Sequence, residues 1–137
     1  MTTIIQADLT GTGSVEQLMH EMGPVASSCE LERGLLFCNA GTLGELAPVE
    51  QLSDPEGIQS SADLNLTNFM WTVSKFSQWW KQTAPDCRLD IVNISSLAAV
   101  EAMPSFGVYC AVKAARDMYL QVAAKDFHAS GLKIYVW

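Results

Sequence analysis

A serine, a tyrosine and a lysine in the second half of the chain have the types and spacing of a group that passes a proton to a carbonyl. Tyr109 and Lys113 are four residues apart, so they share one face if this segment is a helix. A lysine ammonium next to a phenol stabilises the phenolate, and the phenol then gives up its proton more readily. Ser96 precedes Tyr109 by thirteen residues and can hold the carbonyl oxygen in front of it. The three groups predict protonation of a carbonyl as a hydride arrives, or the reverse reaction on an alcohol.

The same residues also have simpler explanations. A tyrosine four residues before a lysine occurs by chance in many helices, and a serine at the end of a strand usually caps a turn. The surrounding elements must therefore show whether the three side chains meet.

Predicted strands and helices alternate along the chain. Continuous apolar runs predict four strands, at 3–7, 34–38, 88–96 and 133–137. Apolar residues at helical spacing predict three long helices, at 14–22, 63–81 and 109–127. Two prolines break residues 46–63, where we expect a surface connection with a short helical piece. This order predicts a single α/β domain with a Rossmann-like parallel sheet, covered by helices on both faces.

The predicted strands end in small or polar residues. In open parallel sheets, ligands bind at the carboxyl ends of the strands. We therefore expect one site built from three strand ends, namely Asp8 and Leu9, the Asn39-Ala40-Gly41 turn, and Asn93 to Ser96.

Composition limits the partners and the compartment. The chain has 137 residues, a net charge of -7 and no basic stripe, which argues against nucleic-acid binding. Its four cysteines show no CxxC spacing, so reduced thiols are favoured over disulfides or a zinc site. Neither a leader nor an apolar run of eighteen residues is found, so a soluble cytoplasmic protein without a membrane anchor is expected.

Three motifs resemble those of the short-chain dehydrogenase/reductase family: "CNAG" after a strand, "NISS" at the end of the next core strand, and "YCAVKAARD". This resemblance covers essentially the whole chain and implies a Rossmann domain that uses NAD or NADP. Within the family, "VNISSLAA", "YCAVKAARDM", "ADLTG" and "LNLT" are most similar to NADPH-dependent carbonyl reductases that act on pterins in tetrahydrobiopterin biosynthesis.

The resemblance implies catalytic roles for four residues. Ser96 orients the substrate carbonyl and Tyr109 is the general acid. Lys113 promotes ionisation of the tyrosine and bonds the ribose hydroxyls of the nicotinamide end. Asn65 matches a helix asparagine that holds a water of the proton relay, although it can also be an ordinary helix residue.

The resemblance also implies which residues bind the cofactor, and Tyr109 and Lys113 are among them. Asn39, Ala40 and Gly41 match a turn under the cofactor, where glycine lets the backbone come close. Asp8 and Leu9 match the pair beside the adenine, and Asp8 has the alternative role of a cap.

One feature of the family is missing. A Gly-rich turn normally brings backbone N–H groups to the pyrophosphate. The only candidate is "LTGTGSVE", with Gly11 and Gly13 but Glu16 in the third position, and it follows the wrong strand. The resemblance thus implies a middle segment of a longer domain, without its first two strands and its substrate loop. We expect the segment at 3–7 either to pair in a new way or to pack poorly, and the isolated chain to bind NADPH weakly or not at all.

The predicted helix at 63–81 is aromatic on more than one side, which suggests a second buried surface. Family members pair through this helix and the one at 109–127, so the resemblance implies a homodimer. Two further possibilities remain open, a short-chain reductase of another ketone or alcohol and a truncated, non-catalytic isoform that acts through dimerisation. The aromatic residues concerned are Phe69, Trp71, Phe76, Trp79 and Trp80.

Overall fold

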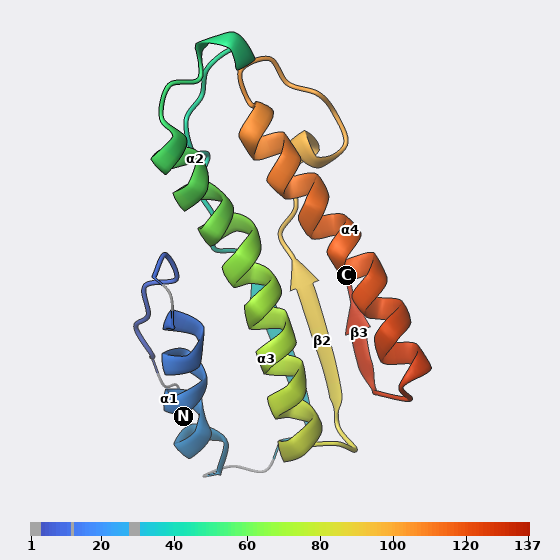
Figure 1. The fold of residues 1–137 in the computed structure, drawn as a ribbon. Helices are drawn as coiled ribbons and strands as arrows, with labels where there is room; N and C mark the ends of the chain where they lie inside the picture. The colour runs from blue at the N-terminus through green and yellow to red at the C-terminus, as the bar shows by residue number, and fades with distance from the viewer. Residues whose placement is uncertain (1–3, 12, 28–30) are drawn as a thin grey trace.

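The computed structural model describes residues 4–11, 13–27 and 31–137, which form one parallel sheet and the helices that pack on it (Figure 1). The strands pair in the order β1-β2-β3, and both pairings are parallel. The predicted Rossmann-like α/β class is thus confirmed. The strands are β1 (Arg33–Cys38), β2 (Arg88–Asn93) and β3 (Ile134–Val136). The helices are α1 (Ser14–Ser27), α2 (Pro55–Ala62), α3 (Asn68–Thr83) and α4 (Gly107–Ala129).

The core lies between the sheet and the inner faces of α3 and α4. Leu89 and Ile91 alternate on one face of β2 and are completely buried there. The aromatic residues of α3 pack on this face at helical spacing, which accounts for most of the aromatic content of that helix. The buried cluster includes Phe69, Val73, Phe76 and Trp80 of α3 and Leu120 of α4.

The opposite face of the sheet is uncovered by the described residues, so the prediction of two covered faces is wrong for this part of the chain. Figure 1 shows α1, α3 and α4 on the same side of the sheet. On the other side, Leu35 and Phe37 of β1 are 53% and 60% exposed. The apolar sequence of β1 is typical of a strand buried on both faces. Among the described residues, no element packs on this second face.

One charged residue on the uncovered face is nevertheless buried. The Asp90 carboxylate pairs with Arg33 at 2.8 Å and with Arg88 at 2.6 Å. The indole of Trp137 also donates a hydrogen bond to Asp90, at 2.8 Å. The Arg88 guanidinium above all, then Trp137 and Arg33, hold the pKa of Asp90 well below its usual range.

The predicted first strand is absent from the sheet. Residues 4–8 have no regular structure, and Thr3 lies outside the described residues. Ile4 is 91% exposed, and the segment is attached to α3, where Asn68 donates a hydrogen bond of 2.6 Å to the Leu9 carbonyl. The strand prediction is therefore wrong for residues 4–7, since the segment is held against α3 and the outer edge of β1 stays unpaired within the described residues. Poor packing is the outcome observed, and β1 forms an edge of the sheet.

The long middle helix begins earlier than predicted. A helical path runs from Pro55 to Thr83, through α2, a π-helical turn at Asp63–Thr67, and α3. Asp54 caps its start by accepting a hydrogen bond of 2.8 Å from the Gly57 amide, and Pro55 occupies the first turn. The short helical piece expected in residues 46–63 is thus the first part of this helix. The helix predicted at 109–127 is confirmed as α4.

Cys38, Cys87 and Cys110 are free thiols, and Cys29 lies outside the described residues. Burial raises the pKa of the Cys38 thiol to about 11, so this thiol is neutral and a poor nucleophile. In residues 4–11, 13–27 and 31–137, no three His, Cys, Asp or Glu side chains form a potential metal site. None of the helices in these ranges is long and apolar enough to cross a membrane.

We expect Gly34→Ala to destabilise the fold by about 1–3 kcal/mol, the usual cost of overpacking a core. A methyl group at Gly34 would lie 2.7 Å from two ring carbons of Trp80 and 2.9 Å from Leu89. Urea unfolding of the two proteins measures this difference. Gly23→Ala in α1 is the matched control, since its methyl group would meet no atom within 4 Å. Equal loss of stability in both variants would show that Gly34 is not a packing position.

Candidate active site

Tyr109 and Lys113 lie one turn apart near the start of α4 and open into a hollow of about 280 Å³. The hollow lies where β1 and β2 end, as the rule for parallel sheets predicts. The structure therefore brings together the predicted tyrosine, the predicted lysine and two residues of the predicted cofactor turn. The lining residues are Asn39, Gly41, Thr42, Leu43, Ile94, Ser95, Tyr109 and Lys113.

Lys113 is buried and fixed to the end of β2. Its ammonium donates a hydrogen bond of 2.8 Å to the Ile94 carbonyl and lies 5.6 Å from the centre of the Tyr109 ring. Burial lowers the pKa of Lys113, the Arg116 cation lowers it further, and Asp117 opposes both. Within residues 4–11, 13–27 and 31–137, only one of the three ammonium hydrogens is used, which leaves two for a ligand in the hollow.

The two serines of the "NISS" segment are used differently. Ser95 donates its hydroxyl hydrogen to Asp117, at 2.7 Å. Ser96 instead accepts a hydrogen bond of 3.2 Å from the Ala98 amide, as the N-cap of a short 3₁₀ turn at Leu97–Ala99. A carbonyl oxygen needs a donor, and of these two serines only Ser96 keeps its hydroxyl hydrogen unused within the described residues. Ser95 lines the hollow and Ser96 does not. The available hydroxyl hydrogen therefore favours Ser96 as the donor to a carbonyl, whereas position in the hollow favours Ser95.

Asn65 is completely buried in the π-helical turn and bonds the loop that follows β1. Its carbonyl oxygen accepts from the Thr42 amide at 3.0 Å, and its amide nitrogen donates to the Thr42 carbonyl at 2.9 Å. The same nitrogen also donates to the backbone and side-chain oxygens of Ser61. Both amide hydrogens are therefore used inside the protein, and the side chain sets the position of Thr42 at the hollow.

The close approach of the Asn65 side chain requires a glycine at position 41. A methyl group at this position would lie 2.8 Å from the side-chain oxygen of Asn65. The absence of a side chain thus lets the turn approach the buried asparagine. From the sequence, glycine was expected here because it lets the backbone come close to the cofactor.

Arg116 and Asp117 of α4, with Asn93 of β2, form a polar cluster that the sequence analysis missed. Arg116 donates to the carbonyls of Cys38 and Ala40, at 2.7 and 3.1 Å, and to the Asn93 side chain at 3.1 Å. Asp117 accepts from Asn93 at 2.7 Å. One signal was present in the sequence, because an arginine three residues after Lys113 falls on the same helix face.

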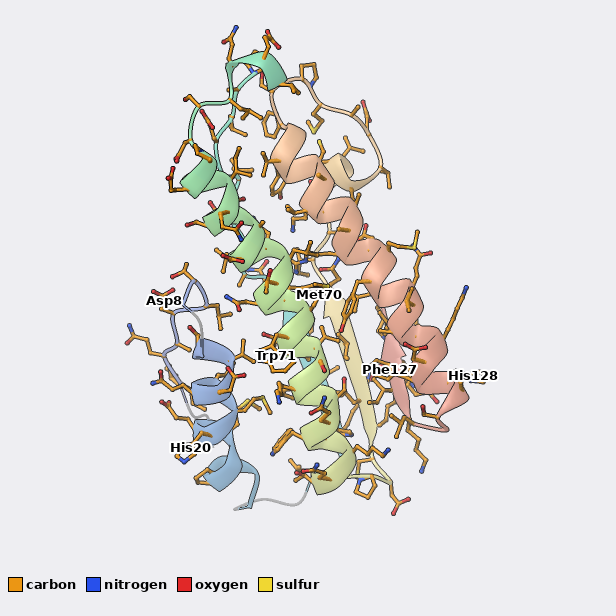
Figure 2. The ribbon with its side chains drawn as sticks, in the orientation of Figure 1. Asp8, His20, Met70, Trp71, Phe127 and His128 are labelled. Atoms are coloured by element: carbon orange, nitrogen blue, oxygen red, sulfur yellow. The ribbon has the colours of Figure 1, made fainter. Side chains whose placement is uncertain are left out.

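The predicted adenine-side residues lie elsewhere. Leu9 lines a second hollow of about 140 Å³, which also includes Asn39, Ala40 and Arg116. Asn39 and Ala40 therefore lie between the Tyr109 hollow and Leu9. Asp8 is exposed on the loop before α1 (Figure 2) and accepts two hydrogen bonds from Thr10, which lower its pKa. These bonds close a turn at residues 8–10, so Asp8 does not cap α1, which begins at Ser14.

Neither Gly11 nor Gly13 lines either of these two hollows. Gly13 instead lines a separate hollow with Glu16 and Trp71, where the Trp71 indole donates to the Glu16 carboxylate between α3 and α1 (Figure 2). This position agrees with its rejection as a pyrophosphate turn.

Comparison with known proteins identifies the family of the chain. Residues 1–137 match the family described as short chain dehydrogenase. Sepiapterin reductase of Rattus norvegicus is 37% identical over 125 residues, which are 88% of this chain and 46% of the relative. Sepiapterin reductase of Bos taurus is 35% identical over 123 residues, 89% of this chain and 46% of the relative. The chain thus spans about half the length of these relatives.

Solved structures of the same kind share the fold. A short chain dehydrogenase from Mycobacterium smegmatis has a TM-score of 0.78 at 25% identity, over 95% of this chain and 49% of that one. A 4-hydroxyisoleucine dehydrogenase complexed with NADH has a TM-score of 0.77 at 25% identity, over 96% of this chain and 54% of that one. Motifs, strand order and sequence agree, and the chain belongs to the short-chain dehydrogenase family.

Proposed function

We propose that residues 1–137 carry the proton-transfer half of an NADPH-dependent carbonyl reductase of the sepiapterin reductase kind, which serves tetrahydrobiopterin biosynthesis. One observation carries the proposal: Tyr109 and Lys113 open into one hollow with the Asn39–Gly41 turn. The relatives at 35–37% identity named sepiapterin reductase support a pterin carbonyl as the substrate. A reductase of another ketone or alcohol remains the second candidate, since relatives named benzil reductase and diacetyl reductase also match.

In this proposal the protein's own groups manage the proton. Ser96 donates a hydrogen bond to the carbonyl oxygen, and Tyr109 transfers its phenolic proton to the same atom. The Lys113 ammonium stabilises the resulting phenolate. Asn65 holds Thr42 at the hollow and so acts through position, with no amide hydrogen left for a relay water. The nicotinamide cofactor supplies the hydride when it is bound.

The residues present fit one part of that cofactor. Lys113, with two free ammonium hydrogens, would bond the ribose hydroxyls at the nicotinamide end. Asn39 and Ala40 would pass beneath the cofactor, with Leu9 and Asp8 on the adenine side. The described residues contain no Gly-rich turn for the pyrophosphate, because Gly13 lies in a different hollow.

We therefore expect the 137-residue chain alone to bind NADPH weakly or not at all. Titration of NADPH against tryptophan fluorescence measures this directly, since four tryptophans are present. Saturable binding in the micromolar range would show that the chain holds the pyrophosphate by other means.

Activity requires the rest of a domain, so the proposed function is tested in a chimera. In this completed domain, residues 1–137 replace the matching segment of the rat sepiapterin reductase. We expect it to oxidise NADPH when sepiapterin is added. A folded, NADPH-binding chimera that reduces simple diketones and leaves sepiapterin unchanged would favour the second candidate.

A pair of serine variants in the completed domain decides which hydroxyl acts. We expect Ser96→Ala to lower kcat about 10²-fold, the usual cost of losing one donor to the developing oxyanion. Ser95→Ala should have a much smaller effect, since the Ser95 hydrogen is held by Asp117. Steady-state kinetics of the two variants gives the answer, and the reverse order of effects would assign the role to Ser95.

We also propose that the chain forms a homodimer through the outer faces of α3 and α4. Met118 and Val122 of α4 and Trp71 of α3 are large apolar residues left exposed on these helices. This surface supports the alternative of a non-catalytic isoform as well, because pairing does not need the cofactor. Light scattering after size exclusion should give twice the mass of the chain, and a monomer would contradict the proposal.

A further inference from the structure

Arg116 is a completely buried arginine that joins α4 to the ends of two strands. Its three nitrogens donate to the carbonyls of Cys38 and Ala40 and to the Asn93 side chain, at 2.7, 3.1 and 3.1 Å. Its guanidinium also lies 4.1 Å from the centre of the Phe69 ring. The side chain is 0% exposed and contacts β1, β2 and α3 at once.

Packing alone does not explain a cation at this position. Both ion pairs among the described residues belong to Asp90, so the acceptors of Arg116 are neutral oxygen atoms. Burial lowers the pKa of Arg116, which reflects the cost of removing the charge from water. A charge is costly to bury unless it is hydrogen-bonded, and the three hydrogen bonds of Arg116 meet that requirement. The geometry of the three hydrogen bonds is therefore the feature that an apolar side chain would not provide.

Those bonds end on both sides of the candidate site. Cys38 and Ala40 flank Asn39, the first residue of the turn that lines both hollows. On the other strand, Asn93 directly precedes Ile94, whose carbonyl holds Lys113. One guanidinium thus fixes the end of β1 relative to the end of β2.

Arg116 also lies on the face of α4 that carries the reacting groups. It follows Lys113 by three residues and Tyr109 by seven, and these spacings place all three side chains on one side of a helix. Its neighbour Asp117 accepts hydrogen bonds from Asn93 and Ser95, both at 2.7 Å. Arg116 and Asp117 therefore both form hydrogen bonds with the end of β2, which leads to Ser96.

We propose that Arg116 is a positioning residue, which holds the Asn39–Gly41 turn at the separation from Tyr109 and Lys113 that hydride and proton transfer to one carbonyl require. The inference rests on the proposed function for its chemical meaning. Its structural content, a fixed distance between the turn and α4, is independent of substrate and cofactor.

Hydrogen exchange in the 137-residue chain, followed by NMR, tests the structural content. Ile94 donates its amide to the Cys38 carbonyl and Thr42 donates its amide to Asn65, so both amides report on the strand end and its loop. We expect Arg116→Lys, which keeps the charge and loses the three-way contact, to speed exchange at both amides about tenfold. Arg88→Met is the control. It also removes an arginine, but at the amino end of β2, the end opposite to Ile94. Unchanged exchange at Ile94 and Thr42 in Arg116→Lys would overturn the proposal.

Kinetics of the completed domain tests the functional content. We expect Arg116→Lys to raise the KM for NADPH about tenfold, while Arg88→Met lowers the unfolding midpoint and leaves that KM unchanged. If both arginine variants lower stability and neither changes the KM, Arg116 is structural and the proposal fails. Arg116→Met removes the charge together with all three hydrogen bonds, and where this variant folds, its KM for NADPH should rise further. Failure of the unmodified completed domain to reduce a carbonyl would instead count against the proposed function, and the exchange experiment would still decide the role of Arg116.

Discussion

Tyr109→Phe is expected to lower the rate of carbonyl reduction by the completed domain about 10³-fold, within the range that general acid catalysis contributes. The substitution removes only the phenolic hydroxyl, which forms no hydrogen bond with the described residues. The ring keeps its edge contact with Phe106, with centroids 6.4 Å apart. Folding should therefore be unchanged, and the loss should fall on kcat.

Tyr135→Phe is the matched control for this variant. Tyr135 lies on β3, outside the Tyr109 hollow, and is exposed beside Arg88. The same chemical change there should leave kcat unaltered. A similar loss in both variants, or full activity of Tyr109→Phe, would remove Tyr109 from the role of acid.

Asn65→Leu is expected to reduce the free energy of unfolding by about 3 kcal/mol. The leucine has a similar size and leaves the Thr42 amide, the Thr42 carbonyl and the Ser61 hydroxyl without their partner, at about 1–3 kcal/mol for each group that stays buried. Thr42 is exposed, so water can satisfy part of this loss. Urea unfolding of the 137-residue chain measures the effect.

Asn68→Leu makes the same substitution three residues later and removes a single hydrogen bond, to the Leu9 carbonyl. Its expected cost is about 1 kcal/mol. Equal destabilisation by the two variants would mean that Asn65 does not clamp the Thr42 segment. In the completed domain, Asn65→Leu should also reduce carbonyl reduction, because Thr42 lines the hollow.

Local patterns were sufficient to predict the helix that carries Tyr109 and Lys113 and the strand ends beneath it. Both depend on short-range spacing, since side chains four residues apart share a helix face and parallel strands end on the same side of the sheet. The meeting of Tyr109, Lys113 and Gly41 in one hollow follows from these two rules. The start of the long helix was harder to predict, because the capping signal at Asp54 and Pro55 lies within a polar segment.

Other features depend on contacts between distant residues. The segment at 4–7 has the composition of a strand, and whether it joins the sheet depends on a neighbour for pairing. The uncovered face with Leu35 and Phe37 depends in the same way on what packs against it. The cluster of Arg116 with Asn93 joins elements 23 residues apart, and the functions of Ser95 and Ser96 differ only through partners that the sequence does not identify.

The most direct test of the central claim, that residues 1–137 supply the acid for carbonyl reduction, is NADPH oxidation by the completed domain with and without sepiapterin. We expect NADPH oxidation that requires both sepiapterin and the Tyr109 hydroxyl. A completed domain that folds and binds NADPH, yet oxidises none of it with sepiapterin or any other carbonyl compound, would contradict the account.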